Sequence, residues 1–295
     1  MSTQSESIIT PKTQESLLKI FPGGVVFFDL ETTGLSPLFD RVIEFAGVKI
    51  LRDQYPVTFS MLVKPDIPIS DENSAIHGIT NDDVADCESE AQAAPKIRNF
   101  ISTLPLVAHN AKFDIGFLMA MYHRAGLDTH NNSVYCSCNL SRKLNRDAKN
   151  HRLSTLCEQF NITLDNHHRA LDDSIACLSV FNSVCEKSKD IRAIGSSALL
   201  YQAGEFQKAF DKLMPECLKD LEGHCTNRVP LVIKYKGGKK KNAERKIIPF
   251  SLLPLPSGIA LYAKCQTTNL FKYYKVEKIT EMFTQKDEEI DKVQQ

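Results

Sequence analysis

Four carboxylates in three short segments have the residue types that metal-assisted hydrolysis needs. Asp29 and Glu31 follow an apolar run in Phe-Phe-Asp-Leu-Glu-Thr-Thr-Gly. Asp114 ends His-Asn-Ala-Lys-Phe-Asp, and Asp173 ends His-Arg-Ala-Leu-Asp-Asp. Carboxylate oxygens are the ligands that Mg²⁺ and Mn²⁺ prefer. The four acids therefore predict a site for two divalent cations that cuts phosphodiester bonds.

The spacing of Asp29 and Glu31 is informative because both come at the end of a predicted strand. Side chains two residues apart in a strand point to the same face, and neighbouring carboxylates repel each other unless a cation joins them. The alternative is a solvated strand edge. The strand context favours the metal site, because the same spacing occurs elsewhere without a preceding apolar run, at Asp86–Glu88, Asp220–Glu222 and Asp287–Glu289.

Asp114 and Asp173 each head an apolar stripe on a predicted helix. An acid at a helix start can simply face water, where the helix dipole stabilises it by about 0.3–1 kcal/mol. A carboxylate that points inward is costly unless it is paired, and no Lys or Arg recurs at a complementary position, so a divalent cation is the expected partner. The stripes are Phe117, Leu118, Met121 and Ala125 after Asp114, and Ala176, Cys177, Val180 and Val184 after Asp173.

His168 precedes Asp173 by five residues in a predicted loop. A loop histidine is usually a surface residue. Beside a metal cluster, however, its near-neutral pKa suits it to take a proton from an attacking water. His167 has no motif role and serves as the internal comparison.

The elements that must position these residues form an α/β pattern. Three β-like runs come first, at residues 25–28, 42–50 and 57–63, and predict a meander. Helical and strand patterns follow, which predicts a mixed sheet flanked by helices. These patterns are a helix at 91–103, a strand at 106–108, and helices near 112–125, 137–145, 153–160 and 171–187.

The later part of the chain changes character. Residues 188–230 read as mainly helical, and short β-like runs then alternate with Gly, Pro, Lys and Asn. A chain of 295 residues is longer than one typical domain. We therefore predict a tail and short helix at 1–23, a catalytic domain at 24–187, a helical connector at 188–230, a small β-rich domain at 231–283 and a polar tail at 284–295.

The acids and the histidine, in this order, resemble the DEDD 3′ to 5′ exonucleases, specifically the histidine-containing branch that includes the proofreading subunit of bacterial replicative polymerases. The resemblance covers about residues 24–184 and includes the segments 43–46, 75–80 and 151–153. It implies a ribonuclease H-like fold in which the four acids hold two Mg²⁺ or Mn²⁺ ions. It further implies that His168 deprotonates the attacking water, that one metal orients this water, and that the other stabilises the leaving 3′ oxygen.

The same resemblance implies a substrate site. Thr33, Gly34 and Leu35 match the segment that holds the terminal nucleotide in the family, with Leu35 as an apolar wedge against the base. Asn110 and Phe113 are further substrate-side candidates, and a structural role would explain each of them equally well. The expected product is a nucleoside 5′-monophosphate.

The C-terminal part resembles the core of WYL domains over about fifty residues, from Ile233 to Ile279. It departs from that family where the naming Trp-Tyr-Leu stretch falls on residues 259–261. Two usual arginines fall on Lys272 and Lys278, and lysine keeps the charge but loses the bidentate fork. Arg245, Lys272 and Lys278 form a candidate anion site, and the alternative is a β-domain used for docking.

Composition limits the partners and the compartment. Basic and acidic residues number 36 each, so affinity for nucleic acid must come from local patches. The nine cysteines show no disulfide or zinc spacing and read as reduced thiols. The first nineteen residues lack an apolar signal core, and no stretch reaches about 20 apolar residues, so we expect a cytoplasmic protein without a membrane segment.

Three functions follow from these patterns. The first is a metal-dependent 3′ to 5′ exonuclease that acts on single-stranded DNA 3′ ends in repair or editing, with a polymerase or repair protein recruited by the C-terminal domain. The second is an exoribonuclease that trims RNA 3′ ends. The third is a nucleic-acid-binding regulator with a ligand-sensing C-terminal domain, and the four intact acids count against it.

Overall fold

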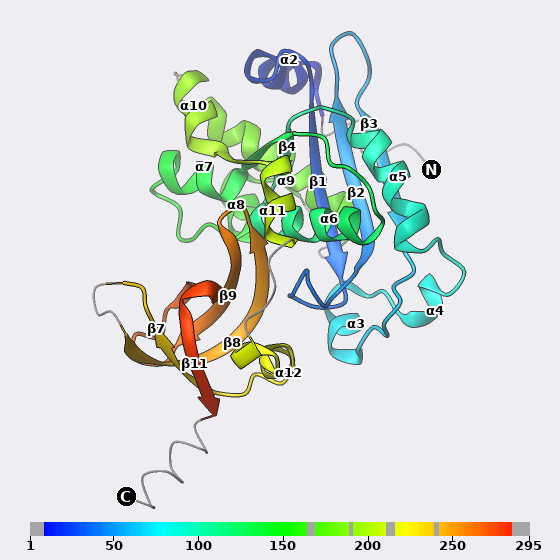
Figure 1. Cartoon of the computed structure of the whole chain (residues 1–295). Helices are drawn as coiled ribbons and strands as arrows, with labels where there is room; N and C mark the ends of the chain where they lie inside the picture. The colour runs from blue at the N-terminus through cyan, green and yellow to red at the C-terminus, as the bar shows by residue number, and fades with distance from the viewer. Residues whose placement is uncertain (1–8, 164–168, 189–190, 211–215, 239–241, 285–295) are drawn as a thin grey trace, which may run out of the picture. The chain divides into compact units, whose positions relative to one another are not determined.

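The computed structural model describes residues 9–163, 169–188, 191–210, 216–238 and 242–284. The chain divides into two compact units (Figure 1). The first unit comprises Met1–Gly34 and Arg41–Gly204, and the second comprises Leu35–Asp40 and Glu205–Gln295. Among the described residues, no helix has both the length and the apolar character needed to cross a membrane.

A six-stranded mixed sheet forms the centre of the first unit, with strand order β3-β2-β1-β4-β5-β6. β1, β2 and β3 form the predicted antiparallel meander, β4 and β5 continue the sheet in parallel with β1, and β6 is antiparallel to β5. The predicted fold class is therefore confirmed. The strands are β1 (Val25–Thr32), β2 (Val42–Ile50), β3 (Val57–Leu62), β4 (Leu106–Ala108), β5 (Ser133–Cys136) and β6 (Leu199–Gln202).

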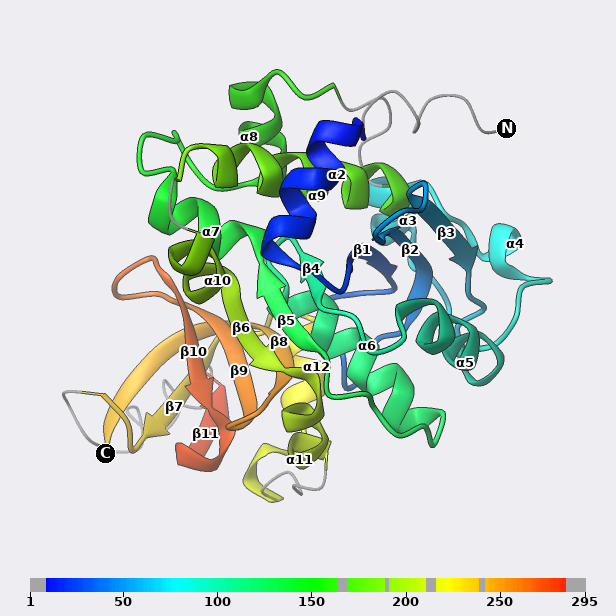
Figure 2. The same ribbon diagram turned by 90° about the horizontal axis from the view of Figure 1, so that it is seen from above.

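Helices cover both faces of this sheet (Figure 2). Successive side chains of β1 point to opposite faces, and Phe27 packs on Phe181 of α9 whereas Phe28 stacks with Phe45, which meets Phe100 of α5. The result is a three-layer arrangement. The helices are α2 (Pro11–Ile20), α3 (Asp71–His77), α4 (Asn81–Val84), α5 (Glu90–Ile101), α6 (Lys112–Arg124), α7 (Ser137–Leu144), α8 (Leu153–Phe160), α9 (Ala170–Glu186) and α10 (Ile191–Ala198).

Two features differ from the expectations for the first unit. β1 runs beyond the predicted apolar run of 25–28 to Thr32, so the first two acids lie within the strand. The predicted helical connector 188–230 contains the strand β6 in its described part, and this strand is part of the central sheet. The first compact unit accordingly extends to Gly204, whereas the predicted limits of the catalytic domain stay a prediction.

The second unit is built on a five-stranded antiparallel sheet with order β10-β9-β8-β7-β11. Its core contains Leu231, Ile247 and Leu261, and Leu38 and Phe39 from the loop between β1 and β2 pack against that core. Its elements are β7 (Leu231–Tyr235), β8 (Ala243–Leu255), β9 (Gly258–Cys265), β10 (Phe271–Lys275) and β11 (Ile279–Thr284), the turns η1 (Ala203–Phe206), η2 (Glu216–Leu218) and η3 (Val276–Lys278), and the helices α11 (Gln207–Phe210) and α12 (Leu221–Thr226).

Candidate active site

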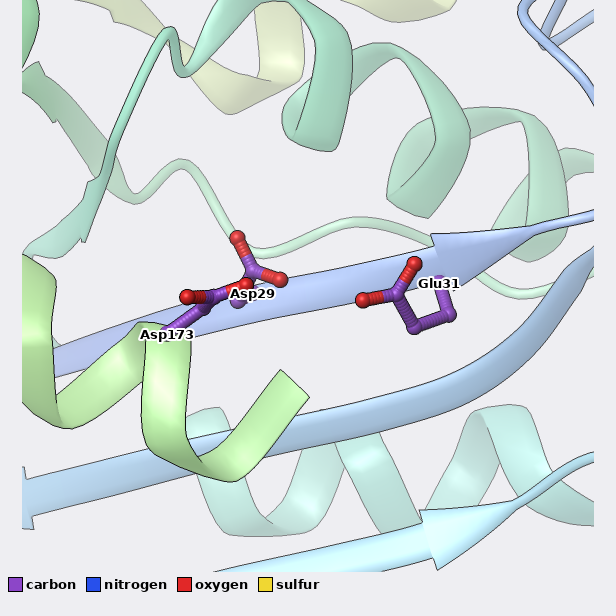
Figure 3. Close-up of side chains that lie close together, drawn as sticks. All are labelled: Asp29, Glu31 and Asp173. Atoms are coloured by element: carbon purple, nitrogen blue, oxygen red, sulfur yellow. The ribbon is translucent and has the colours of Figure 1, made fainter. Parts of the chain in front are cut away.

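β1 places Asp29 and Glu31 on the same face of the central sheet, as the two-residue spacing predicts. Both side chains are half-buried among otherwise buried strand residues. One carboxylate oxygen from each, together with one from Asp173, lies within 4.8 Å of the others (Figure 3). The three carboxylates thus converge on one point, although Asp173 is more than 140 residues away along the chain.

Asp173 reaches β1 because it lies in the first turn of α9, which begins at Ala170 and packs against β1 and β2. Its backbone N–H donates to the carbonyl of Arg169 at 3.1 Å, as expected at a helix start. The stripe predicted below it, including Ala176 and Val180, is fully buried. The helix therefore aims this carboxylate toward the sheet.

Asp114 occupies the first turn of α6 and is only 3% exposed. Burial, helped by the charge of nearby Asp173, raises its pKa to about 8, although hydrogen bonds from its own backbone and that of Leu30 act in the opposite direction. The Leu30 contact places it beside β1, next to Asp29. The structure therefore brings all four predicted acids to one end of the sheet.

The electrostatics of this cluster favour a bound cation. Burial, followed by the charges of Asp114 and Asp173, holds the pKa of Asp29 well above its usual range. Burial and the charge of Asp173 raise the pKa of Glu31 to about 8. Carboxylates with such pKa values remain protonated at neutral pH unless positive charge is added. An all-oxygen donor set of this kind fits hard divalent cations.

A further acid, Glu44, belongs to the cluster and was not assigned a role from the sequence. In the antiparallel pairing of β1 with β2, Glu44 lies directly opposite Glu31, and it is 2% exposed. Its oxygens accept from the Arg169 guanidinium at 2.9 Å and 3.3 Å and from the N–H of Ala170 at 3.2 Å. A charge-assisted pair of this kind makes burial of Glu44 tolerable.

Arg169 corrects the expectation that no basic side chain accompanies the acids. Besides binding Glu44, its charge lowers the pKa of Glu31. It also ties the start of α9, next to His168 in the sequence, to β2. The only sequence signals were the motif that contains Glu44 and the position of Arg169 inside the third acidic motif.

His168, the predicted general base, and His167 lie outside the described residues. A different histidine, His109, lies close to the cluster in the sequence but is engaged by structural contacts. Its ring nitrogens meet the Ser137 hydroxyl at 2.8 Å and the His151 carbonyl at 3.0 Å. Burial lowers its pKa to about 4, so it stays neutral near pH 7.

The predicted nucleotide segment forms a sharp turn directly after β1. Thr33 is buried, its N–H donates to the carbonyl of Arg41 at 2.9 Å, and its hydroxyl accepts from the N–H of Arg41 at 2.9 Å. The Asn73 amide also donates to the Thr33 carbonyl. After Gly34, Leu35 is 42% exposed, so its side chain is accessible to a ligand.

The other predicted substrate residues are placed differently. Asn110 is exposed and adopts a left-handed backbone conformation with φ of 60° just before α6. Phe113 is half-buried and its ring packs 4.8 Å from that of Phe117. Of the predicted anion site, Arg245 lies in β8, Lys272 in β10 and Lys278 in η3, so three separate elements carry it.

Comparison with known proteins assigns the first unit to a family. The family model described as Exonuclease matches residues 26–181, more than half of the chain. The chain belongs to the Exonuclease family. The expectation of an exonuclease domain is thereby confirmed, and the acidic cluster lies inside the matched region.

Similar sequences include long bacterial polymerases. The chain is 39% identical over 184 residues to a DNA polymerase III PolC-type from Caldanaerobacter subterraneus, covering 62% of this chain and 13% of that protein. A Bacillus cereus DNA polymerase III PolC-type is 40% identical over 151 residues, covering 51% and 10%. The chain thus spans only a small part of the length of these relatives.

Solved structures share the fold. One is titled the structure of exonuclease I that suggests how processivity is achieved, with a TM-score of 0.53, 20% identity, and coverage of 82% of this chain and 55% of that one. Another is Escherichia coli exonuclease I in complex with a dA16 oligonucleotide, with a TM-score of 0.51, 19% identity and the same coverage. At these identities the likeness establishes the fold.

Proposed function

We propose that this protein is a metal-dependent 3′ to 5′ exonuclease that releases nucleoside 5′-monophosphates from DNA 3′ ends in repair or editing. The observation that carries the proposal is the convergence of Asp29, Glu31 and Asp173 within 4.8 Å, with buried Asp114 beside them. The PolC-type relatives favour DNA as the substrate, and so does the shared fold of an exonuclease I that binds an oligonucleotide.

Asp29, Glu31, Asp114 and Asp173 would hold two Mg²⁺ or Mn²⁺ ions, which when bound stabilise negative charge on the phosphate and its leaving oxygen. His168 accepts the proton of the attacking water on an imidazole nitrogen. The ion pair between Arg169 and Glu44 fixes the start of α9, the residue that follows His168 in the sequence, on the neighbouring strand β2. The metal therefore offsets a repulsion between carboxylates that the metal-free cluster cannot relieve except by protonation.

The turn after β1 supplies the binding surface for the 3′-terminal nucleotide. Thr33 and Gly34 bring the backbone close to Glu31, and Leu35 packs against the terminal base. Asn110 and Phe113, just before and at the start of α6, contact the nucleotide from the side of Asp114.

The finer roles of the second unit also belong to this proposal. The WYL-like pattern, the anion site of Arg245, Lys272 and Lys278, and recruitment of a polymerase or repair protein remain interpretations of the sequence. The same holds for a cytoplasmic location. What the structure adds is that the loop Leu35–Asp40, which follows the nucleotide-binding turn, belongs to the second unit.

RNA trimming is the alternative activity, because the same acidic cluster could hydrolyse either polymer. A site that selects RNA must contact the 2′-hydroxyl. The regulator hypothesis is weaker, because a binding module has no use for four converging acids, of which Asp29, Glu31 and Asp114 have raised pKa values.

The test compares DNA and RNA oligonucleotides of one sequence, labelled at either end, with Mg²⁺, Mn²⁺ or EDTA. We expect mononucleotides from the 3′ end of DNA, dependent on metal and absent in Asp29→Ala. A preference for RNA would transfer the assignment to the trimming activity. Failure to cleave either polymer would contradict the proposal.

A further inference from the structure

Four aromatic side chains form a continuous strip across three strands of the second unit. The ring of Tyr262 in β9 lies 5.1 Å from that of Phe271 in β10, nearly parallel to it at 17°, and 4.9 Å from that of Tyr273. Phe271 also contacts Phe250 in β8 at 5.1 Å. We call Phe250, Tyr262, Phe271 and Tyr273 the aromatic strip.

The strip lies on the face of the sheet that points away from the core. Tyr274, the residue after Tyr273 in β10, is 4% exposed and belongs to the core, whereas Phe271 is 48% and Tyr273 44% exposed. Aromatic side chains this exposed are seldom left on a surface as neighbours unless they bind something. Packing in the core of the second unit therefore does not explain why these rings lie together on the surface.

The charge around the strip is positive. Strand alternation places three basic residues, Lys246, Lys264 and Lys275, and one acid, Glu244, on the face of the strip. Lys264 lies directly opposite Phe271 in the strand pairing, and the Arg228 guanidinium lies 4.3 Å from the centre of the Phe250 ring.

The strip is continuous with the loop that follows the nucleotide-binding turn. Ser251, the residue after Phe250, is 2% exposed, and its hydroxyl donates to the Leu35 carbonyl at 2.5 Å. The next residue, Leu252, donates its N–H to the Ser36 hydroxyl at 3.1 Å. β8 therefore carries both Phe250, a ring of the aromatic strip, and Ser251, which hydrogen-bonds to Leu35.

We propose that the aromatic strip is a stacking platform for the single-stranded part of the nucleic acid whose 3′ end reaches Leu35. Rings interleaved with basic side chains bind single strands, because unpaired bases stack on the rings while the charges attract phosphates. A duplex keeps its bases paired and cannot stack in this way. The inference rests on the proposed function and specifies its substrate as a single strand bound along the second unit.

The first test measures binding of fluorescein-labelled dT20, U20 and a blunt 20-base-pair duplex to the full chain in EDTA, where no cleavage occurs. Stacking on an aromatic ring contributes about 1–3 kcal/mol per base, so the double variant Phe271→Ala/Tyr273→Ala should bind dT20 at least about tenfold more weakly. Tyr55→Ala removes a ring that is 92% exposed on the first unit and should leave the affinity unchanged. Unchanged dT20 affinity in the double variant, or an equal loss for the duplex, would overturn the platform.

The second test keeps a ring at the strip, so that folding is not in question. The natural chain has no tryptophan, so Tyr273→Trp provides a single fluorescent reporter. We expect dT20 to quench its emission and the blunt duplex to leave it unchanged, whereas U20 reports whether RNA stacks as well. Absence of quenching at a dT20 concentration that saturates binding would exclude stacking at this ring. Wild-type protein that binds dT20 but releases no mononucleotide with Mg²⁺ would instead contradict the proposed exonuclease function.

Discussion

The acidic cluster of the first unit and the aromatic strip of the second unit are assembled in different ways. The cluster contains like charges, and its raised pKa values show that the metal-free fold is under electrostatic tension there. The rings of the strip attract one another, and the strip carries no such tension. The comparison teaches that a catalytic site is recognised by charged side chains that need an added ion to offset their repulsion. A surface that binds a polymer is recognised by aromatic side chains that the fold leaves exposed.

Removing one acid gives the largest expected effect. Asp29→Ala should abolish nucleotide release, a greater loss than the roughly 10- to 100-fold that follows from changing residues that only orient metal ligands. The variant should stay folded in EDTA, because one repelling charge is gone. The control is Asp172→Asn. Asp172 lies beside Asp173 in the first turn of α9 but outside the acidic cluster. Full activity in Asp29→Ala would remove the site assignment.

His168→Ala should lower kcat by about 10²- to 10⁴-fold, the usual contribution of a positioned general base, with little change in KM. His167→Ala should leave both constants near those of the wild type. The measurement is steady-state release of mononucleotides across pH. Equal losses in the two histidine variants would show that the general-base role does not belong to His168.

The ion pair between Arg169 and Glu44 is expected to stabilise the fold around the acidic cluster. Arg169→Met leaves the 2% exposed Glu44 carboxylate without its guanidinium and should lower the free energy of unfolding by about 1–3 kcal/mol. Adding Glu44→Gln should recover part of that loss, which a double-mutant cycle by urea unfolding would measure. Additive effects of the two changes would mean that the pair contributes nothing to stability.

The raised pKa values predict how pH affects the metal-free protein. The folded state binds protons more tightly at Glu31 and Asp114, whose pKa values rise from 4.5 and 3.8 to about 8. Stability is therefore greatest below the unfolded-state values and should fall as pH rises from about 4 through 8. Thermal unfolding in EDTA checks this, and Asp114→Asn should make the decline smaller. A stability that increases over this range would contradict the tension in the cluster.

Ser251→Ala should give the smallest effect and connects the two regions compared above. Losing one hydrogen bond, worth about 0.5–1.5 kcal/mol, loosens Leu35 and should raise KM for oligonucleotides about two- to tenfold while kcat changes little. Ser257→Ala, in the exposed turn between β8 and β9, is the matched control. A fall in kcat with constant KM would show that the Ser251–Leu35 hydrogen bond affects the chemical step rather than binding of the terminal nucleotide.

Much of the first unit could be predicted because its signals are local. Strand alternation places Asp29 and Glu31 together, and helical periodicity aims Asp114 and Asp173 inward, so short segments suffice. Glu44 and Arg169 could not be assigned in this way. Their contact joins residues 125 positions apart and depends on the strand register and on where α9 begins.

The aromatic strip could not be predicted from periodicity either. Its rings come from three strands, and the pairing of β8 with β9 shifts register between Pro249 and Ser251, which breaks the simple alternation. β8 also extends from Ala243 to Leu255 as one long strand, whereas the sequence pattern predicts only short runs in this region. In addition, the loop Leu35–Asp40 lies more than 200 residues from the strand that holds it.

Metal binding tests the central claim most directly. We would titrate Mn²⁺ into the wild type and Asp29→Asn by calorimetry at pH 7, in two buffers with different ionisation enthalpies. Because the pKa values of Glu31 and Asp114 lie near 8, binding of two ions should release protons, and Asp29→Asn should lose at least one of the ions. Identical Mn²⁺ binding by the two proteins, or binding without proton release, would contradict the assignment of these acids as the metal site.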